Sequence, residues 1–145
     1  MERPALLNVT VETSELTLAS RVESVEEAAV AVAGILQRSG VGEDIAFGVD
    51  MAIREAVTNA VLHGNKQDEA KFIHVKVKSS PGCLEINVED QGVGFNPADV
   101  PNPTETENIL KSSGRGIFFM RNFMDDVEWL IRPEGGTTVR MTKQF

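Results

Sequence analysis

The chain has 145 residues, a length that suits one domain with its own hydrophobic core. Its 41% hydrophobic and 25% charged residues are ordinary for a globular protein, while a formal net charge of -8 and a pI near 4.8 argue against a broad surface for DNA or RNA. The single cysteine, Cys83, excludes an internal disulfide, and the sequence has neither a signal-like N-terminus nor an apolar run of about 18 residues. We therefore expect one domain over residues 1–145 in a soluble, cytoplasmic protein that contacts neither a membrane nor, directly, nucleic acid.

The N-terminal segment predicts a strand and then a helix. Apolar residues alternate in LLNVTV, from Leu6 to Val11, which favours a strand. Ser20 and Glu23 have the spacing of a capping box, in which each side chain satisfies a free backbone donor at a helix start. Apolar residues then recur at helical spacing as far as Gly40, a residue that is typical of helix ends.

A second helix is predicted to begin at Glu43 or Asp44 and to continue to residue 64. Within it, Glu55, Asn59 and His63 are spaced four residues apart and therefore share one stripe. A solvated face is the ordinary explanation of such a polar stripe, and a functional site is the alternative. The side that packs is formed by apolar residues at three- and four-residue spacing: Val49, Ala52, Ile53, Ala56 and Ala60.

The C-terminal half changes to a period of two, which is typical of strands. Two antiparallel strands with one wet face are predicted at 73–77 and 84–88, joined by the turn residues 79–82. A long proline-containing loop follows, then an apolar helix at 117–124 and a closing hairpin around 133–136. This order has no regular βα repeat, so it predicts an α+β fold in which helices cover one face of a mixed, mostly antiparallel sheet.

Two glycine pairs flank the long loop. Gly92 and Gly94 directly follow Asp90, and Gly114 and Gly116 directly precede the apolar helix. Glycine permits close backbone approach, and a helix N-terminus presents free N–H groups to an anion, so the second pair is a candidate phosphate seat. Taken alone, either pair is more typical of a turn. The P-loop and dinucleotide-binding signatures are absent, which excludes those two kinds of nucleotide site.

Three motifs are more specific together than apart. The segments Glu55-x-x-x-Asn59-Ala60-x-x-His63-Gly64, Asp90-x-Gly92-x-Gly94 and Gly114-Arg115-Gly116 resemble, in the same order, the N, G1 and G2 boxes of the gyrase, heat-shock chaperone, histidine-kinase and MutL ATPase superfamily. Within it, the chain looks most like the bacterial anti-sigma factor serine kinases, and the resemblance covers nearly the whole chain. It implies the two-layer, Bergerat-type ATP-binding fold of that superfamily.

The resemblance also implies a role for individual residues. Asn59 would place its side-chain carbonyl on Mg²⁺, which favours oxygen ligands, and Glu55 would take a proton from an attacking hydroxyl. Asp90 would accept a hydrogen bond from the adenine amino group. The other implied nucleotide contacts are Gly92 and Gly94 near the base, Gly114, Arg115 and Gly116 at the phosphates, and Thr137 near the adenine. A solvated arginine and an ordinary strand threonine are the alternatives at two of these positions.

At the level of function, the resemblance implies an ATP- and Mg²⁺-dependent protein-serine kinase. Such a protein sequesters a sigma factor in one state and phosphorylates a serine of an anti-sigma factor antagonist in the other. The region of about 96–113 would be its nucleotide lid, His63 would cap or orient rather than react, and a homodimer is expected because relatives commonly dimerise. Two alternatives remain open: a non-catalytic nucleotide-binding module in a partner-switching pathway, and a switch that acts on a phosphatase or scaffold protein.

Overall fold

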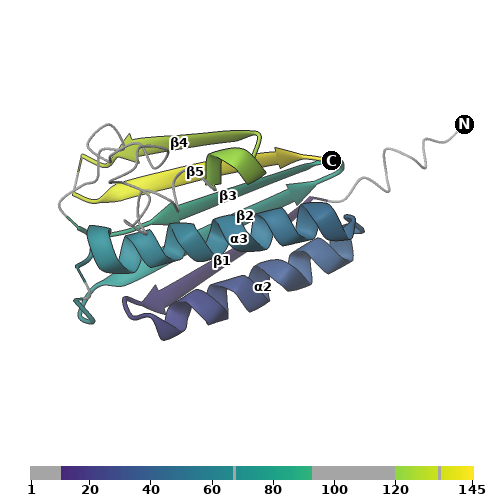
Figure 1. Ribbon diagram of the computed structural model, residues 1–145. Helices are drawn as coiled ribbons and strands as arrows, with labels where there is room; N and C mark the ends of the chain where they lie inside the picture. The colour runs from purple at the N-terminus through teal and green to yellow at the C-terminus, as the bar shows by residue number, and fades with distance from the viewer. Residues whose placement is uncertain (1–10, 67, 93–119, 134) are drawn as a thin grey trace, which may run out of the picture.

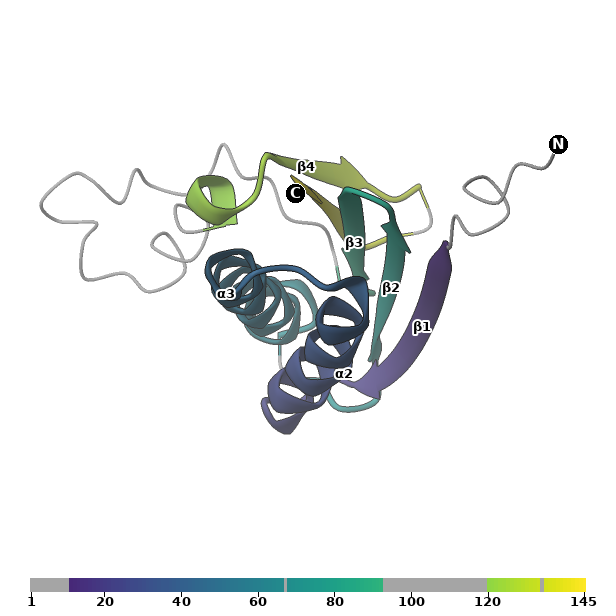
Figure 2. The ribbon, with the colours of Figure 1, turned by 90° about the vertical axis from the view of Figure 1, so that its right-hand side faces the viewer.

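The computed structural model describes residues 11–66, 68–92, 120–133 and 135–145. In this part of the chain, two long helices lie side by side on one face of a five-stranded sheet (Figures 1 and 2). The α+β sandwich predicted from the sequence is confirmed. The elements in chain order are β1 (Glu12–Ala19), α2 (Glu23–Ser39), α3 (Glu43–Asn59), the π-helical turn η1 (Ala60–Gly64), β2 (Phe72–Ser80), β3 (Cys83–Glu89), β4 (Asp126–Ile131) and β5 (Thr137–Gln144).

The sheet has the strand order β1-β2-β3-β5-β4, and each described pairing is antiparallel. The turn between β2 and β3 is shorter than predicted, because Ser80 pairs with Cys83 and leaves only Pro81 and Gly82 between the strands. Gly82 has a φ of 77°, a left-handed value that glycine adopts without a steric penalty. The predicted hairpins are confirmed. Alternate residues of β2 and β3 are buried, as the period of two requires: Ile73, Val75, Val77, Leu84, Ile86 and Val88.

The first described strand, β1, follows the segment in which the sequence predicted one. The predicted strand from Leu6 to Val11 lies outside the described residues, apart from Val11 itself. In β1, only Leu16 and Leu18 supply large apolar side chains to the core, so the local pattern is weak. Backbone pairing with β2 along its whole length holds this largely polar segment in the sheet.

Helix α2 begins without the predicted capping box. Val22 occupies the N-cap position and no side chain caps the helix, so the roles predicted for Ser20 and Glu23 are wrong. The N–H of Ser20 donates instead to the backbone oxygen of Lys71 at 3.1 Å, which ties Ser20 to the residue before β2. Its buried hydroxyl has no hydrogen-bond partner in the described part of the chain. The predicted helix end at Gly40 is confirmed, with a left-handed φ of 73°.

Helix α3 begins at Glu43, as predicted, but its last turn is not α-helical. The N–H of Asn65 donates to the oxygen of Ala60, five residues earlier, at 2.8 Å, which is the π-helical pattern. At this turn Asn59 is buried, whereas His63, four residues later, is exposed. The buried side of α3 is the predicted one: Val49, Ala52, Ile53 and Ala56, together with Val57.

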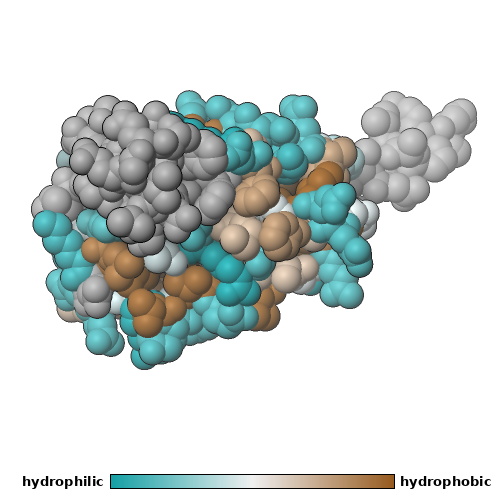
Figure 3. Space-filling view, viewed as in Figure 1, coloured by the Kyte–Doolittle hydropathy of each residue, from teal (hydrophilic) through white to brown (hydrophobic). Residues whose placement is uncertain are grey.

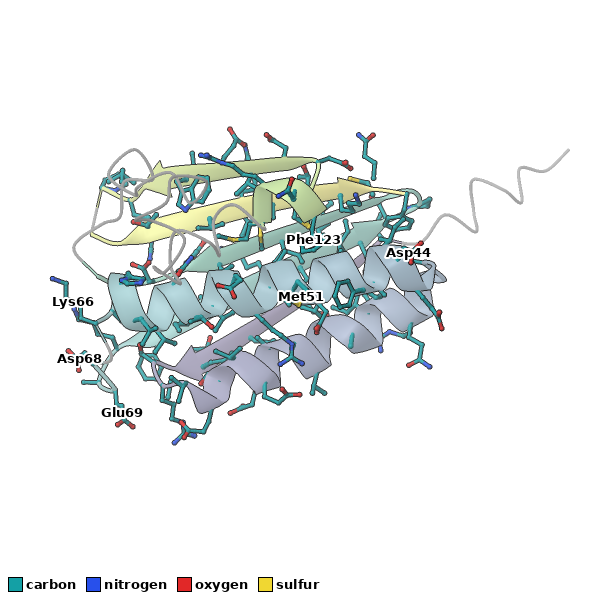
Figure 4. The ribbon with its side chains drawn as sticks, in the orientation of Figure 1. Asp44, Met51, Lys66, Asp68, Glu69 and Phe123 are labelled. Atoms are coloured by element: carbon teal, nitrogen blue, oxygen red, sulfur yellow. The ribbon has the colours of Figure 1, made fainter. Side chains whose placement is uncertain are left out.

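The outer face of the two helices carries apolar side chains among hydrophilic ones (Figure 3). Phe47 of α3 is 60% exposed and packs edge-on against Phe123, with 6.0 Å between the ring centroids. Figure 4 shows Phe123 close to α3, on the side where Met51 lies. This contact docks the helical turn at 120–123 onto α3. Within the described residues, no helix combines the length and the apolar content that crossing a membrane requires.

Candidate functional site

A small pocket lies where the end of α3 meets β3, β4 and β5. It brings together three predicted site residues from distant parts of the chain, Asn59, Asp90 and Thr137. Its volume of about 10 Å³ holds roughly one water molecule, whereas ligands of nucleotide size need several hundred Å³. The described residues therefore form the inner wall of a candidate site. The other lining residues are Ala56, Ala60, Val88, Trp129 and Val139.

Trp129 is the lining residue that sequence reasoning missed. The period of two placed it in the closing hairpin, but gave no sign that its ring would reach a site. β4 pairs only with β5 in the described sheet, and Trp129 lies opposite Val139, which also lines the pocket. The guanidinium carbon of Arg121 lies 5.0 Å from the centroid of the Trp129 ring, a cation–π contact.

Asp90 directly follows β3 and is fixed by backbone groups. Its N–H donates to the oxygen of Thr137 at 2.9 Å. Its Oδ1 accepts from the N–H of Thr137 at 3.1 Å and from the N–H of Gly92 at 3.0 Å. Among the described residues, no group donates to Oδ2. One carboxylate oxygen is thus held by the backbone, and the other, Oδ2, lies next to Gly64.

Burial raises the pKa of Asp90 above its ordinary value of 3.8. The backbone N–H groups of Gly92 and Thr137 and the positive charges of Arg132 and Lys71 oppose this rise without cancelling it. The folded protein therefore binds this proton more tightly than the unfolded chain does. As a result, the contribution of the carboxyl group to the free energy of unfolding falls as the pH rises through the folded-state pKa, and it stays reduced at neutral pH.

We expect Asp90→Asn to raise the free energy of unfolding at neutral pH, because asparagine does not ionise and its Oδ1 can still accept both backbone donors. The gain should shrink as the pH falls and vanish near about pH 3, where the aspartate is protonated in both the folded and the unfolded states. Thermal unfolding at about pH 3 and pH 7 measures the difference, with Glu69→Gln on an exposed loop as the control. A variant less stable than the wild type at neutral pH would show that the ionised carboxylate is net stabilising.

Three glycines surround Asp90 so closely that none has room for a side chain. A Cβ on Gly64 would lie 2.2 Å from Oδ2 of Asp90, and a Cβ on Gly136 would lie 2.2 Å from its backbone oxygen. A Cβ on Gly92 would lie 1.6 Å from the oxygen of Gly64. The backbone of Gly92 therefore approaches the backbone at the end of η1 closely, so the turn after β3 packs directly against the end of η1.

Glu55 and Asn59 lie one turn apart on α3. Burial raises the pKa of the half-buried Glu55, which makes its carboxylate a better proton acceptor near neutral pH. Asn59 is only 8% exposed, and its Nδ2 has no hydrogen-bond partner among the described residues. Leaving a buried polar group unpaired costs about 1–3 kcal/mol, so an orphaned amide facing a pocket is a group available to a ligand.

The remaining predicted site residues, Gly94, Gly114, Arg115 and Gly116, lie outside the described residues, as does the predicted lid at about 96–113. Within the described part, no cluster of three or more acidic, histidine or cysteine side chains could hold a metal ion. A Mg²⁺ ion does not require such a cluster, because it commonly binds through one or two protein oxygens and the phosphates of its substrate. The side-chain oxygen of Asn59 fits that mode of binding, whereas its unpaired Nδ2 is a donor and suits an acceptor such as a phosphate oxygen.

The sequence matches the family model described as Histidine kinase-like ATPase domain over residues 18–143. The chain belongs to this family. It is 34% identical over 132 residues to an anti-sigma F factor from Oceanobacillus iheyensis, and the alignment covers 90% of each chain. The resemblance to the anti-sigma factors of this superfamily, first seen in the three motifs, is confirmed.

Two solved structures share the fold. In the SiaB–SiaC complex from Pseudomonas aeruginosa, the similar chain gives a TM-score of 0.68 at 11% identity, over 95% of this chain and 91% of that one. The RsbU and RsbW domains of a Mycobacterium tuberculosis protein give a TM-score of 0.67 at 19% identity, over 92% of this chain and 32% of that one. At these identities, the likeness establishes the arrangement of helices and strands.

Membership of an ATPase family implies ATP as the ligand of the domain. The pocket suits this ligand in two respects. Asp90 offers an acceptor oxygen that an amino group can use, and Asn59 offers a polar group without a partner. Both lie on the same inner wall, although they come from the end of β3 and from α3.

Proposed function

We propose that this protein is an anti-sigma factor and an ATP-dependent protein-serine kinase, which binds a sigma factor and phosphorylates a serine of an anti-sigma factor antagonist. One observation carries the proposal: Asn59 and Asp90 line a single pocket, and Glu55 lies one helical turn before Asn59. The similarity to an anti-sigma F factor over 90% of the chain supports the choice of partners.

Adenine recognition is assigned to Asp90. Its free carboxylate oxygen accepts a hydrogen bond from the exocyclic amino group, which guanine does not offer at the same position. Gly92 lets the turn after β3 pack against η1, and Thr137 of β5 lines the same pocket as Asp90. The remaining contacts rest on the sequence resemblance, with Gly94 near the base and Gly114, Arg115 and Gly116 at the phosphates.

Replacing Asp90 by asparagine should weaken ATP binding about 10-fold, because a donor then faces the adenine amino group and leaves it unpaired. Isothermal titration calorimetry with ATP measures this effect, and Glu69→Gln again serves as the control. The same variant is expected to be more stable at neutral pH, so a loss of affinity would not reflect unfolding. Unchanged ATP affinity would remove Asp90 from the nucleotide site.

Catalysis is assigned to two residues of α3. Asn59 would hold Mg²⁺ through its side-chain oxygen, and the ion would neutralise charge on the phosphates. Glu55 accepts the proton of the attacking serine hydroxyl while the serine oxygen bonds to the γ-phosphorus. The bond from that phosphorus to the bridging oxygen breaks, and ADP leaves with the electron pair. The raised pKa of Glu55 suits this role, because it brings the base closer to neutral pH.

The test of the kinase is transfer of labelled phosphate. The purified protein is incubated with labelled ATP, Mg²⁺ and a candidate antagonist, and phosphoserine is identified in the product. Labelling of the antagonist is the expected result. Tight ATP binding without labelling would instead favour a non-catalytic nucleotide-binding module that acts by protein–protein interaction.

The proposed function also includes an oligomeric state and a location. Relatives commonly dimerise, so a homodimer is proposed, and light scattering of the purified protein tests it. A protein that sequesters a sigma factor acts in the cytoplasm, where the sigma factor meets RNA polymerase. Co-purification with and without ATP would identify the two partners.

A further inference from the structure

Asn65, just beyond η1, is almost completely buried although it lies at the start of a surface loop. It is 1% exposed. Its Oδ1 accepts a hydrogen bond from the backbone N–H of Gln91 at 2.8 Å, and its Nδ2 donates to the backbone oxygen of Phe72 at 3.1 Å. One side chain thus joins the end of the helix to the first residue of β2 and to the turn that follows β3.

The π-helical turn is what brings Asn65 to this position. Its N–H bonds to the oxygen of Ala60 at 2.8 Å, and the next residue, Lys66, adopts a left-handed φ of 53°. A left-handed residue other than glycine costs free energy, so the chain reverses here at some expense. Figure 4 shows Lys66, Asp68 and Glu69 pointing away from the protein body, whereas Asn65 is buried.

The bonded turn is the one that carries Asp90. Gln91 and Gly92 follow Asp90 directly, and Gly92 already lies against the oxygen of Gly64. The side chain of Gln91 reinforces the arrangement, because its Oε1 accepts from the N–H of Phe72 at 2.7 Å. Asn65 and Gln91 therefore bind the two backbone groups of Phe72 at the start of β2, and Asp90 directly precedes Gln91.

We propose that Asn65 is a positioning residue for base recognition, which fixes the turn from Asp90 to Gly92 onto the end of the helix that bears Glu55 and Asn59. This inference rests on the proposed function, because it assigns Asp90 to the adenine. The Asn65 side chain would then fix the position of Asp90 relative to Asn59. It would thereby set the distance between a base bound at Asp90 and phosphates held near Asn59.

The experiment compares ATP and GTP affinities, by calorimetry, in the wild type and in variants at this position. Asn65→Ala removes the acceptor of the Gln91 N–H, and we expect about 10-fold weaker ATP binding together with an ATP-over-GTP preference reduced about 5-fold or more. Asn65→Asp retains an acceptor oxygen and should keep most of the preference. Ser39→Ala is the matched control, because it removes the 2.8 Å hydrogen bond to Ser79 at the opposite end of β2.

Each outcome decides the proposal. Unchanged affinity in Asn65→Ala, or lower affinity with an unchanged ATP-to-GTP ratio, would overturn the positioning role and leave a purely structural one. An equal loss of preference in Ser39→Ala would also overturn it. If the wild type binds no ATP, the proposed function itself fails, independently of Asn65, and the basis of this inference fails with it.

A second measurement keeps the proposal open to refutation if Asn65→Ala does not fold. Amide hydrogen exchange of the wild type with ATP bound reports directly on the Gln91 N–H. We expect it to exchange far more slowly than the amide of the exposed Glu69. An equally fast exchange at both positions would show that Asn65 does not hold the turn.

Discussion

Replacement of Glu55 by glutamine is expected to reduce phosphoryl transfer to the antagonist by about 100-fold or more while ATP affinity stays within about 2-fold of the wild type. Glutamine has nearly the same shape as glutamate but cannot accept the hydroxyl proton. The half-buried position makes the change tolerable for the fold, because it removes a carboxylate whose ionisation burial already disfavours. Initial rates of phosphoserine formation at saturating ATP, with calorimetry for binding, measure the two quantities.

Glu43→Gln is the matched control for this variant. Glu43 belongs to the same helix but lies exposed in its first turn, remote from the pocket. It should transfer phosphate at the wild-type rate. Equal rates in Glu55→Gln and the wild type would show that Glu55 is not the base, and loss of ATP binding in that variant would assign it to binding instead of proton transfer.

Adding a single methyl group at Gly92 should disrupt the site as strongly as removing a functional group. The Cβ would lie 1.6 Å from the oxygen and 2.3 Å from the carbonyl carbon of Gly64, and both atoms are backbone. The turn must therefore move away from η1 and take Asp90 with it. We expect Gly92→Ala to lower the free energy of unfolding by about 1–3 kcal/mol and ATP affinity by at least about 10-fold.

The same substitution at Gly34 should raise the free energy of unfolding instead of lowering it. Gly34 lies inside α2, and its Cβ would meet only the flexible end of Arg38, at 3.4 Å. Alanine is favoured over glycine by about 1 kcal/mol in a helix interior, so Gly34→Ala should stabilise the protein and leave ATP binding unchanged. Denaturant unfolding and calorimetry on both variants test the contrast. Equal stability losses at Gly34 and Gly92 would refute the close contact at Gly92.

Local patterns predicted most of the secondary structure. The alternation in β2 and β3 and the glycine at the end of α2 depend on neighbours within a few residues, and the structure confirms both. The capping box failed because a distant group overrides it: the N–H of Ser20 already bonds to Lys71, across the sheet. The π-turn of η1 was missed for a related reason, since Asn65 obtains its partners from β2 and from the turn after β3.

The candidate site likewise contains residues that the sequence predicted and residues that depend on tertiary contacts. The motifs and the family resemblance named Asn59, Asp90 and Thr137, and the structure brings these three residues to one pocket. They did not name Trp129 or Asn65, because the site role of each depends on which strands lie next to each other and not on any spacing along the chain. The resemblance gave Glu55 a chemical role and His63 none, and the structure leaves His63 exposed in the π-helical turn.

The sequence by itself determined the fold class, the faces that pack and the family, since periodicity and motif order are properties of the chain and survive any arrangement in space. Only the tertiary structure decided how the pieces of the site are held. Asp90 takes its orientation from backbone groups of Gly92 and Thr137, and Gly64 lies so close to it that a Cβ would not fit between them. These contacts join residues as many as 47 positions apart. They form only when β5 lies beside β3 and the helix end meets the turn, so no local signal could have predicted them.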